Sequence, residues 1–358
     1  MERLNRRLLL AGGVAAALPT AGAAATAFTP VTPGRPLVFP RDHGAHPGFR
    51  TEWWYLTGWL EGPEGPLGFQ VTFFRTRTGL GEDNPSRFAP RQVLFAHAAL
   101  SDPRVGRLLH GQRIARKGFG LAGASERDMD IVLDDWRLVR DPAGTLRTRA
   151  VGEGFGLDLA LAPTQPILLQ GQAGFSRKGP KAEQASWYYT QPHLRVSGTL
   201  EREGRRRPVR GEAWLDREWS STLLDPAAVG WDWTGINLDD GGALTAFRVR
   251  DARGRALWTG GSLRSADGQL WTAPNGAVAF EPGRTWRSPR TGAVYPVAPT
   301  VSLKTPAGER RWALSPLFDD QELDSRPSGG PVYWEGAVRG PGGKGYLELT
   351  GYAAPLRL

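Results

Sequence analysis

The chain has 358 residues, no cysteine and a formal net charge of +9. The lack of cysteine excludes disulfides, thiolate metal sites and a lipid-anchored cysteine. The positive charge is small for a chain of this length. Only five of the 45 basic residues are Lys, so Arg predominates. We interpret this bias as composition rather than a nucleic-acid surface, and we expect the densest run, Arg205 to Arg207, at a solvated hairpin tip.

The first 27 residues have the pattern of an export signal. Arg6 and Arg7 directly precede the apolar run 8–17, which is too short to span a bilayer. The paired arginines predict the twin-arginine route. Cleavage is expected after Ala23, Ala25 or Ala27. No second apolar stretch reaches membrane-spanning length, so the sequence predicts a mature protein that spans no membrane and is periplasmic or secreted.

The mature chain predicts an all-β fold. Its 47 Gly and 29 Pro residues are spread throughout and separate short runs in which apolar and polar residues alternate. Such runs include 68–75, 157–161, 194–200 and 346–350. No long window has helical periodicity, which favours a β-barrel or sandwich over βαβ units.

An internal similarity predicts two tandem units. The segment from Trp54 to Gly58 resembles the one from Trp231 to Gly235, and Phe74-Arg75 resembles Phe247-Arg248 in the following strand. We therefore expect barrels at residues 28–203 and 204–358, with Trp54 equivalent to Trp231 and Phe74 to Phe247.

The segment 213–219 is the strongest candidate site. On a strand, Trp214, Asp216 and Glu218 share one face. A carboxyl group buried beside an indole has a raised pKa and can act as a general acid. The alternative is that the two carboxylates pair with Arg217 or with an Arg on a neighbouring strand.

Three other groups of polar residues are weaker candidates for a functional site. The acidic loop 319–326 allows either a hard-cation site or local pairing with Arg, and the latter is favoured because the loop lacks EF-hand spacing. Glu335, in a strand-like run, is expected as a buried polar group. The short spacing of His43 and His46 has no third ligand nearby, so we predict no metal site.

Taken together, the motifs resemble one family. They are the segments 52–55, 68–75, 187–189, 213–220, 230–233, 319–326 and 333–336. They are similar to those of AttH-type proteins, in the lipocalin-like family that includes the carotenoid hydratases and related fungal pericyclases. The resemblance implies two calycin-like barrels and no cofactor. It makes Asp216, two residues after an aromatic, the proton donor to a carbon–carbon double bond. The hydratases also use an upstream His, which the segment 187–189 lacks.

Fourteen Trp residues suit a hydrophobic ligand, although they equally suit packed barrel cores. We expect six aromatic residues to contact the ligand: Trp54, Tyr55, Trp187, Tyr189, Trp231 and Trp233. Of these, Tyr189 and Trp231 are the expected neighbours of Asp216.

Three functions remain open. The first is a carrier of a hydrophobic, isoprenoid- or lipid-like small molecule, linked to an ABC transport system as AttH is. The second is a hydratase, isomerase or cyclase that uses Asp216 as its acid. The third is a secreted hydrolase or glycan-binding protein. A buried Asp216 in an apolar cavity would favour the enzyme, and a shallow, exposed Trp platform would favour a glycan.

Overall fold

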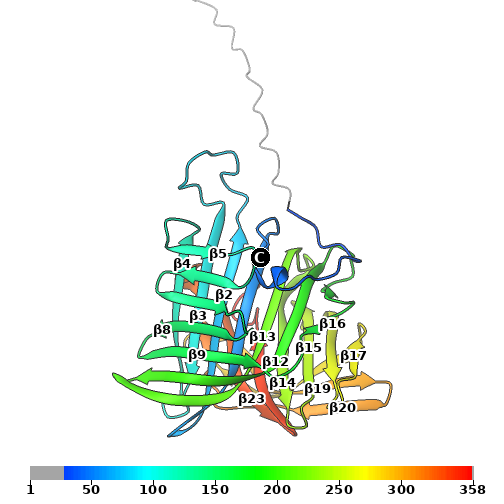
Figure 1. The fold of residues 1–358 in the computed structure, drawn as a ribbon. Coiled ribbons are helices and arrows are strands. Elements are labelled where there is room, and N and C mark those ends of the chain that lie inside the picture. The colour runs from blue at the N-terminus through cyan, green and yellow to red at the C-terminus, as the bar shows by residue number, and fades with distance from the viewer. Residues whose placement is uncertain (1–27, 357–358) are drawn as a thin grey trace, which may run out of the picture.

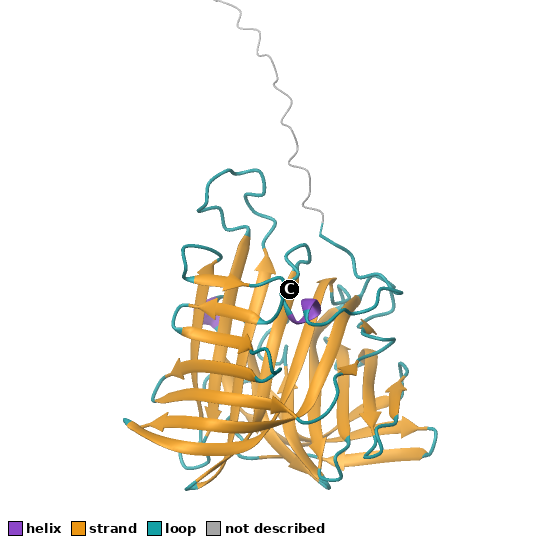
Figure 2. Ribbon diagram, in the orientation of Figure 1, coloured by secondary structure: helices purple, strands orange, loops and turns teal. Residues whose placement is uncertain are grey.

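The computed structural model describes residues 28–356. The export signal lies outside them, so Arg6, Arg7 and the twin-arginine route stay predictions. The regular secondary structure of the described chain is nearly all strand, with two short 3-10 helices, η1 (Arg41–His43) and η2 (Arg326–Ser328) (Figure 2). This confirms the all-β prediction. Within the described residues, no helix has the length and apolar character needed to cross a bilayer.

The first sheet contains thirteen antiparallel strands. The main path runs β4-β3-β2-β1-β13-β12-β9-β8-β7-β6-β5, and β10 and β11 also pair with β12. The strands are β1 (Thr51–Gly62), β2 (Gly65–Arg77), β3 (Gln92–Ser101), β4 (Leu108–Arg116), β5 (Ala122–Ala124), β6 (Asp130–Leu133), β7 (Trp136–Arg140), β8 (Leu146–Gly152), β9 (Phe155–Pro163), β10 (Leu168–Leu169), β11 (Phe175–Arg177), β12 (Ala185–Arg202) and β13 (Arg205–Thr222).

This sheet curls into a nearly closed barrel (Figure 1). At one place on its seam, a Cβ added to Gly111 of β4 would lie 2.7 Å from the Cα of Gly152, at the end of β8. Two glycines let the backbones approach this closely. The barrel interior is filled by one apolar cluster that includes Trp54, Leu56 and Trp187, so it is a packed core.

The rest of the chain forms two further sheets. The eight-stranded sheet follows the order β17-β16-β15-β14-β24-β23-β21, with β22 also paired to β23, and the three-stranded sheet is β18-β19-β20. The strands are β14 (Ala228–Leu238), β15 (Ala243–Asp251), β16 (Ala256–Arg264), β17 (Leu270–Ala273), β18 (Val278–Arg287), β19 (Val294–Thr305), β20 (Gly308–Ala313), β21 (Ser315–Pro316), β22 (Glu322–Asp324), β23 (Val332–Gly340) and β24 (Gly343–Leu349).

The two halves share an aromatic interface. One apolar cluster joins Tyr55, Trp59 and Trp214 of the first sheet to Trp233 and Phe247 of the second. Side chains alternate along β1 and β13. Tyr55, Trp59 and Trp214 therefore point outward from the barrel, whereas Trp54 and Leu56 point inward. The outer face of the first barrel therefore forms one side of a second, interdomain core.

The change of sheet does not coincide with the expected boundary at residue 204. That position lies in the turn of the β12–β13 hairpin, and β13 pairs with β1 along its length. The second sheet begins only with β14. Residues 205–222 are thus part of the first barrel, because β13 closes the gap between β1 and β12. Arg205 and Arg206 are exposed at the expected hairpin tip.

The repeated motifs lie on matching hairpins but in different registers. Trp54 is opposite Phe73, so Phe74 points to the other face of the sheet. Trp231 is opposite Val249, and Phe247 is opposite Trp233 on the same face as Trp231. The two expected equivalences, Trp54 with Trp231 and Phe74 with Phe247, therefore cannot hold together.

Candidate active site at the interface of the two sheets

Strand β13 brings the three predicted residues to one face, as the alternation predicted. The indole Nε1 of Trp214 donates a hydrogen bond of 2.8 Å to Asp216 Oδ1, and Glu218 follows two residues on. Asp216 and Glu218 are both buried. Their face is the outer one, directed at the second sheet.

Asp216 accepts three hydrogen bonds. Besides Trp214, Thr190 Oγ1 donates to Oδ1 at 2.5 Å, and the Tyr188 hydroxyl donates to Oδ2 at 2.6 Å. Both donors come from β12, opposite Asp216 and Glu218 in the ladder. Oδ1 then has two donors for its two lone pairs, whereas Oδ2 has one. A proton on Asp216 therefore belongs on Oδ2.

Further contacts fix the direction of these bonds. Trp233 Nε1 donates to the Tyr188 hydroxyl at 3.1 Å, and Gln170 Nε2 donates to Thr190 Oγ1 at 3.0 Å. An indole or amide N–H can only donate. Each of the two hydroxyls accepts one hydrogen bond and therefore donates its own proton to Asp216.

The Asp216 pKa is raised to about 7. Burial is the main cause and the nearby Glu218 adds to it, while the three donors act in the opposite direction. Within the described chain, Asp216 has no Arg or Lys at ion-pair distance. The expected raised pKa without an Arg partner is thus present in the structure.

Glu218 has a different environment. Lys178 Nζ lies 3.1 Å from Glu218 Oε1, and the same ammonium group lies over the rings of Tyr188 and Phe247, 4.5 and 4.1 Å from their centroids. Glu218 therefore stands beside a cation, whereas Asp216 does not in the described part of the chain.

The second sheet contributes another pair of acids. Glu335 on β23 is directly opposite Glu348 on β24, and Glu348 is opposite Trp233 on β14. Burial, with Glu348 nearby, raises the Glu335 pKa well above its usual range. Burial, with Asp216 and Glu218 nearby, raises the Glu348 pKa to about 7. Like charges at close range favour protonation, so this interface holds protons near neutral pH.

The Glu335 carboxylate meets the hydroxyls of Tyr55 and Tyr333, which act to lower its pKa against the effect of burial. Tyr55 is opposite Asp216 in the ladder, and its ring meets the Trp233 ring edge-on at 5.2 Å. Tyr55 and Glu335 therefore form a polar contact between the two sheets, next to Asp216.

The predicted aromatic residues divide between two faces. Tyr55, Trp231 and Trp233 belong to the interdomain cluster around Asp216. Trp54, Trp187 and Tyr189 point into the first barrel, where they are packed core residues. The prediction that Tyr189 adjoins Asp216 is wrong, whereas ligand contact by Trp54, Trp187 and Tyr189 stays a prediction. The actual neighbour is Tyr188, because consecutive strand residues face opposite ways.

Several site residues were not predicted: Tyr188, Thr190, Gln170, Lys178 and Glu348. Tyr188 lies in the motif 187–189 that the sequence singled out, but its contact with Asp216 required knowledge of which strands pair. The same holds for the other four.

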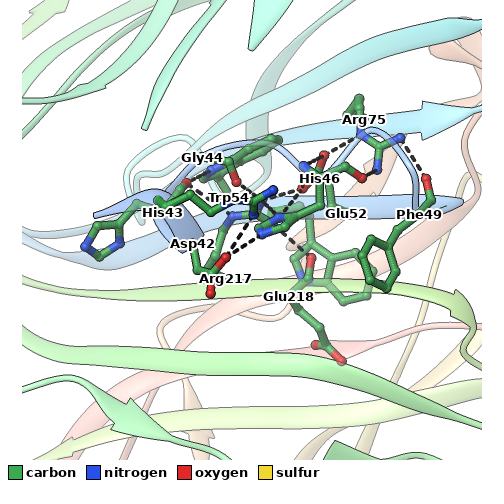
Figure 3. Close-up of polar contacts among 12 residues, drawn as sticks. Asp42, His43, Gly44, His46, Phe49, Glu52, Trp54, Arg75, Arg217 and Glu218 are labelled. Carbon is green, nitrogen blue, oxygen red and sulfur yellow. Dashed lines mark hydrogen bonds and ion pairs between the residues drawn. The ribbon is translucent and has the colours of Figure 1, made fainter. Parts of the chain in front are cut away.

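A second polar cluster lies on the inner face, directly behind the site (Figure 3). The buried Glu52 carboxylate is held by Arg75 and Arg217, and His46 contacts both Glu52 and Asp42. The Arg217 guanidinium lies 3.9 Å from the centroid of Trp54. The two arginines hold the Glu52 pKa well below its usual range. This cluster anchors the η1 segment across the barrel and keeps Arg217 away from Asp216.

Of two small cavities, one adjoins Trp214 of the site and the other lies apart from it. One of about 10 Å³ is lined by residues that include Thr57, Trp59, Trp214 and Asn237; it has room for about one water molecule. The other, of about 50 Å³, lies by the β12–β13 hairpin and includes Leu200. Asp216 lines neither. In the described residues, no group of three or more His, Asp or Glu side chains is arranged to hold a metal ion.

A family model described as AttH-like matches residues 30–352. A crystal structure of an AttH-type protein from Nitrosomonas europaea is 54% identical, with a TM-score of 0.84, and the match covers 91% of this chain and 100% of that one. Kievitone hydratase from Nectria haematococca has 16% identity and a TM-score of 0.65 over 92% of this chain and 97% of its own.

No match was found among the curated proteins. The resemblance to kievitone hydratase shows a common fold. The family match and the Nitrosomonas structure both extend over nearly the whole described chain, and the resemblance first suggested by the tryptophan motifs is confirmed. This chain belongs to the AttH-like family.

Proposed function

We propose that this protein adds water across a carbon–carbon double bond of a hydrophobic small molecule at the Asp216 site, or forms such a bond by removing water from an alcohol. The observation that carries this proposal is a buried aspartate with a pKa of about 7 and no cationic partner. Such a group is part protonated at neutral pH, which suits a general acid. A fold shared with kievitone hydratase, a hydratase by name, supports it.

The reaction needs only Asp216 and water. The proton on Asp216 Oδ2 passes to one alkene carbon, and the π electrons form the new C–H bond. The other carbon becomes a cation, which the aromatic rings around Asp216 stabilise, Trp214 and Trp233 among them. A water molecule adds through its oxygen and gives a proton back to the Asp216 carboxylate. The acid is thereby restored.

The alternatives fit the site less well. A carrier of a hydrophobic molecule has no need of an acid with a raised pKa, although it would use the same aromatic interface. A glycan platform would need exposed Trp side chains, and all fourteen Trp residues of the chain are buried or half-buried. The link to an ABC transport system and the periplasmic location stay proposals drawn from the family resemblance and from residues 1–27.

The test is direct. Purified protein is incubated in ¹⁸O-labelled water with kievitone and with a panel of prenylated and isoprenoid alkenes. Mass spectrometry then follows the appearance of products that have gained one labelled water. The proposal expects such a product from wild-type protein and its loss in Asp216→Asn. Binding of a panel member without labelled product, unchanged by Asp216→Asn, would support the carrier instead.

A further inference from the structure

The β2–β3 loop and the turn after β4 form an exposed apolar patch at one end of the first barrel. Its members are Leu80, Phe88, Phe119 and Leu121, which are 64%, 62%, 44% and 55% exposed. We call these four residues the tip patch. The β2–β3 loop projects beyond the rest of the barrel (Figure 1). Large apolar side chains gathered on a projecting loop usually mark an interaction site.

The two loops are held together by ring contacts. Phe88 and Phe119 stack with their centroids 4.8 Å apart. The Arg116 guanidinium lies over both rings, 4.9 Å from Phe88 and 5.5 Å from Phe119, and Arg87 lies 5.5 Å from Phe119. The aromatic side chains are therefore presented as one ordered unit with its cations beside it.

The charge around the tip patch is positive on balance. Residues 77–91 and 116–121 contain the bases Arg77, Arg87, Arg91, Arg116 and Lys117 and the acids Glu82 and Asp83. Glu82 is taken up by an ion pair with Arg77. The remaining surface combines exposed Phe and Leu side chains with an excess of cations, which is the combination that binds anionic lipid surfaces.

The tip patch is also connected with the candidate site. Glu218, Trp53, Phe74, Phe95 and Ile114 are opposite one another on β13, β1, β2, β3 and β4. Phe74 and Phe95 stack at 4.5 Å, and Ile114 lies two residues before Arg116. An apolar row thus crosses the outer face of the barrel from the interdomain core to the tip patch.

We propose that the tip patch docks the protein on a bilayer that contains anionic lipids, with Phe88 and Phe119 inserted among the headgroups and Arg87 and Arg116 beside lipid phosphates. Docking in this orientation places the apolar row at the membrane surface. Vesicle binding does not depend on the proposed hydratase chemistry, so either proposal can fail without the other.

The test is co-sedimentation of the full chain with vesicles of phosphatidylcholine alone or mixed with phosphatidylglycerol. Wild-type protein should bind the mixed vesicles and lose binding in high salt. Phe88→Ser with Phe119→Ser, and separately Arg87→Gln with Arg116→Gln, should each weaken binding by about tenfold or more. Leu270→Ser with Val294→Ser is the control, since these apolar side chains are exposed on the second half of the chain.

The outcomes separate cleanly. All four altered residues of the test variants lie at the surface, so thermal unfolding should match wild type and loss of binding cannot be ascribed to misfolding. Absence of wild-type binding to the mixed vesicles would overturn the proposal. So would equal loss of binding in the control variant, or binding by the double Phe variant as strong as that of wild type.

Discussion

Asp216 and Arg217 are consecutive residues on β13 whose side chains lie on opposite faces of the first sheet. Arg217 is buried in the barrel against Glu52, and Asp216 is buried outside it against Tyr188 and Thr190. The two-residue period of a strand thus keeps the neighbouring arginine away from the acid. Asp216 therefore has no arginine partner among the described residues, although an arginine follows it directly in sequence.

The first prediction concerns the acid itself. Asp216→Asn keeps the size of the side chain and removes the transferable proton. Turnover of any alkene that wild-type protein hydrates should fall by about 100-fold or more, the usual loss for a general acid. Steady-state assays of both proteins measure this. Turnover within a few-fold of wild type would rule out Asp216 as the proton donor.

The second prediction is a pH profile. The acid must be protonated to act, and its pKa is raised to about 7. The value of kcat/KM should therefore be constant below about pH 7, as far as Asp216 determines it. Above that pH it should fall by about tenfold per pH unit, which is the basic limb of the profile. Rates measured from pH 5 to pH 9 test this. A rate that rises through pH 7 would point to a base instead of an acid.

Tyr188→Phe should shift the fall in kcat/KM to higher pH. The Tyr188 hydroxyl donates to Asp216 Oδ2 and holds its pKa down, so its removal should raise the midpoint of the fall. Tyr189→Phe is the matched control, because the next residue points into the barrel and contacts His43. A midpoint that moves equally in both variants, or in neither, would argue against Tyr188 as a positioning residue.

The stability of the protein should also depend on this group. The folded-state pKa of Asp216 is raised above its unfolded value of 3.8 to about 7, so the folded state binds the proton more tightly. The contribution of Asp216 to the free energy of unfolding should fall as the pH rises from about 4 to about 7 and then level off. Asp216→Asn should lack this fall, which denaturant unfolding of both proteins across that range would show. Parallel curves would mean that Asp216 is not perturbed.

The polar cluster behind the site should matter for stability rather than acidity. Arg217→Met leaves the buried Glu52 with one ion-paired arginine fewer, and breaking a buried pair typically costs about 3–5 kcal/mol. Arg210→Met, on the same strand but in an exposed pair with Glu61, should change the free energy of unfolding by less than about 0.5 kcal/mol. Urea titration compares the two. Similar values for both would contradict a structural role for the cluster.

Local patterns were sufficient for part of this molecule. Alternation placed Trp214, Asp216 and Glu218 on one buried face, and the Trp motifs identified the family. For Tyr189 the same rule gave the wrong face, because Tyr188 and not Tyr189 is directed at Asp216. Strand β12 has register shifts between Ala185 and Trp187 and between Gln191 and Leu194. Side-chain alternation counted from either end of the strand therefore does not give the face of its middle residues.

Long-range pairing was beyond the sequence. Thr190 reaches Asp216 from the neighbouring strand, Gln170 supports Thr190 from a separate short segment, and Glu348 arrives from the last strand of the chain. None of these contacts has a local signature. The boundary at residue 204 failed for the same reason, since a hairpin tip looks the same within a sheet as between two sheets.

The pairing of β1 with β13 also has a consequence for how the chain folds. Trp53 and Arg217, which contact each other across these strands, are 164 residues apart. During synthesis, β1 can pair with β2 at once, but its other edge stays open until residue 222 has emerged. Contacts of such high sequence separation form slowly, and an open edge strand is a template for aggregation. We therefore expect the first barrel to close late in synthesis, with one edge of β1 exposed until then.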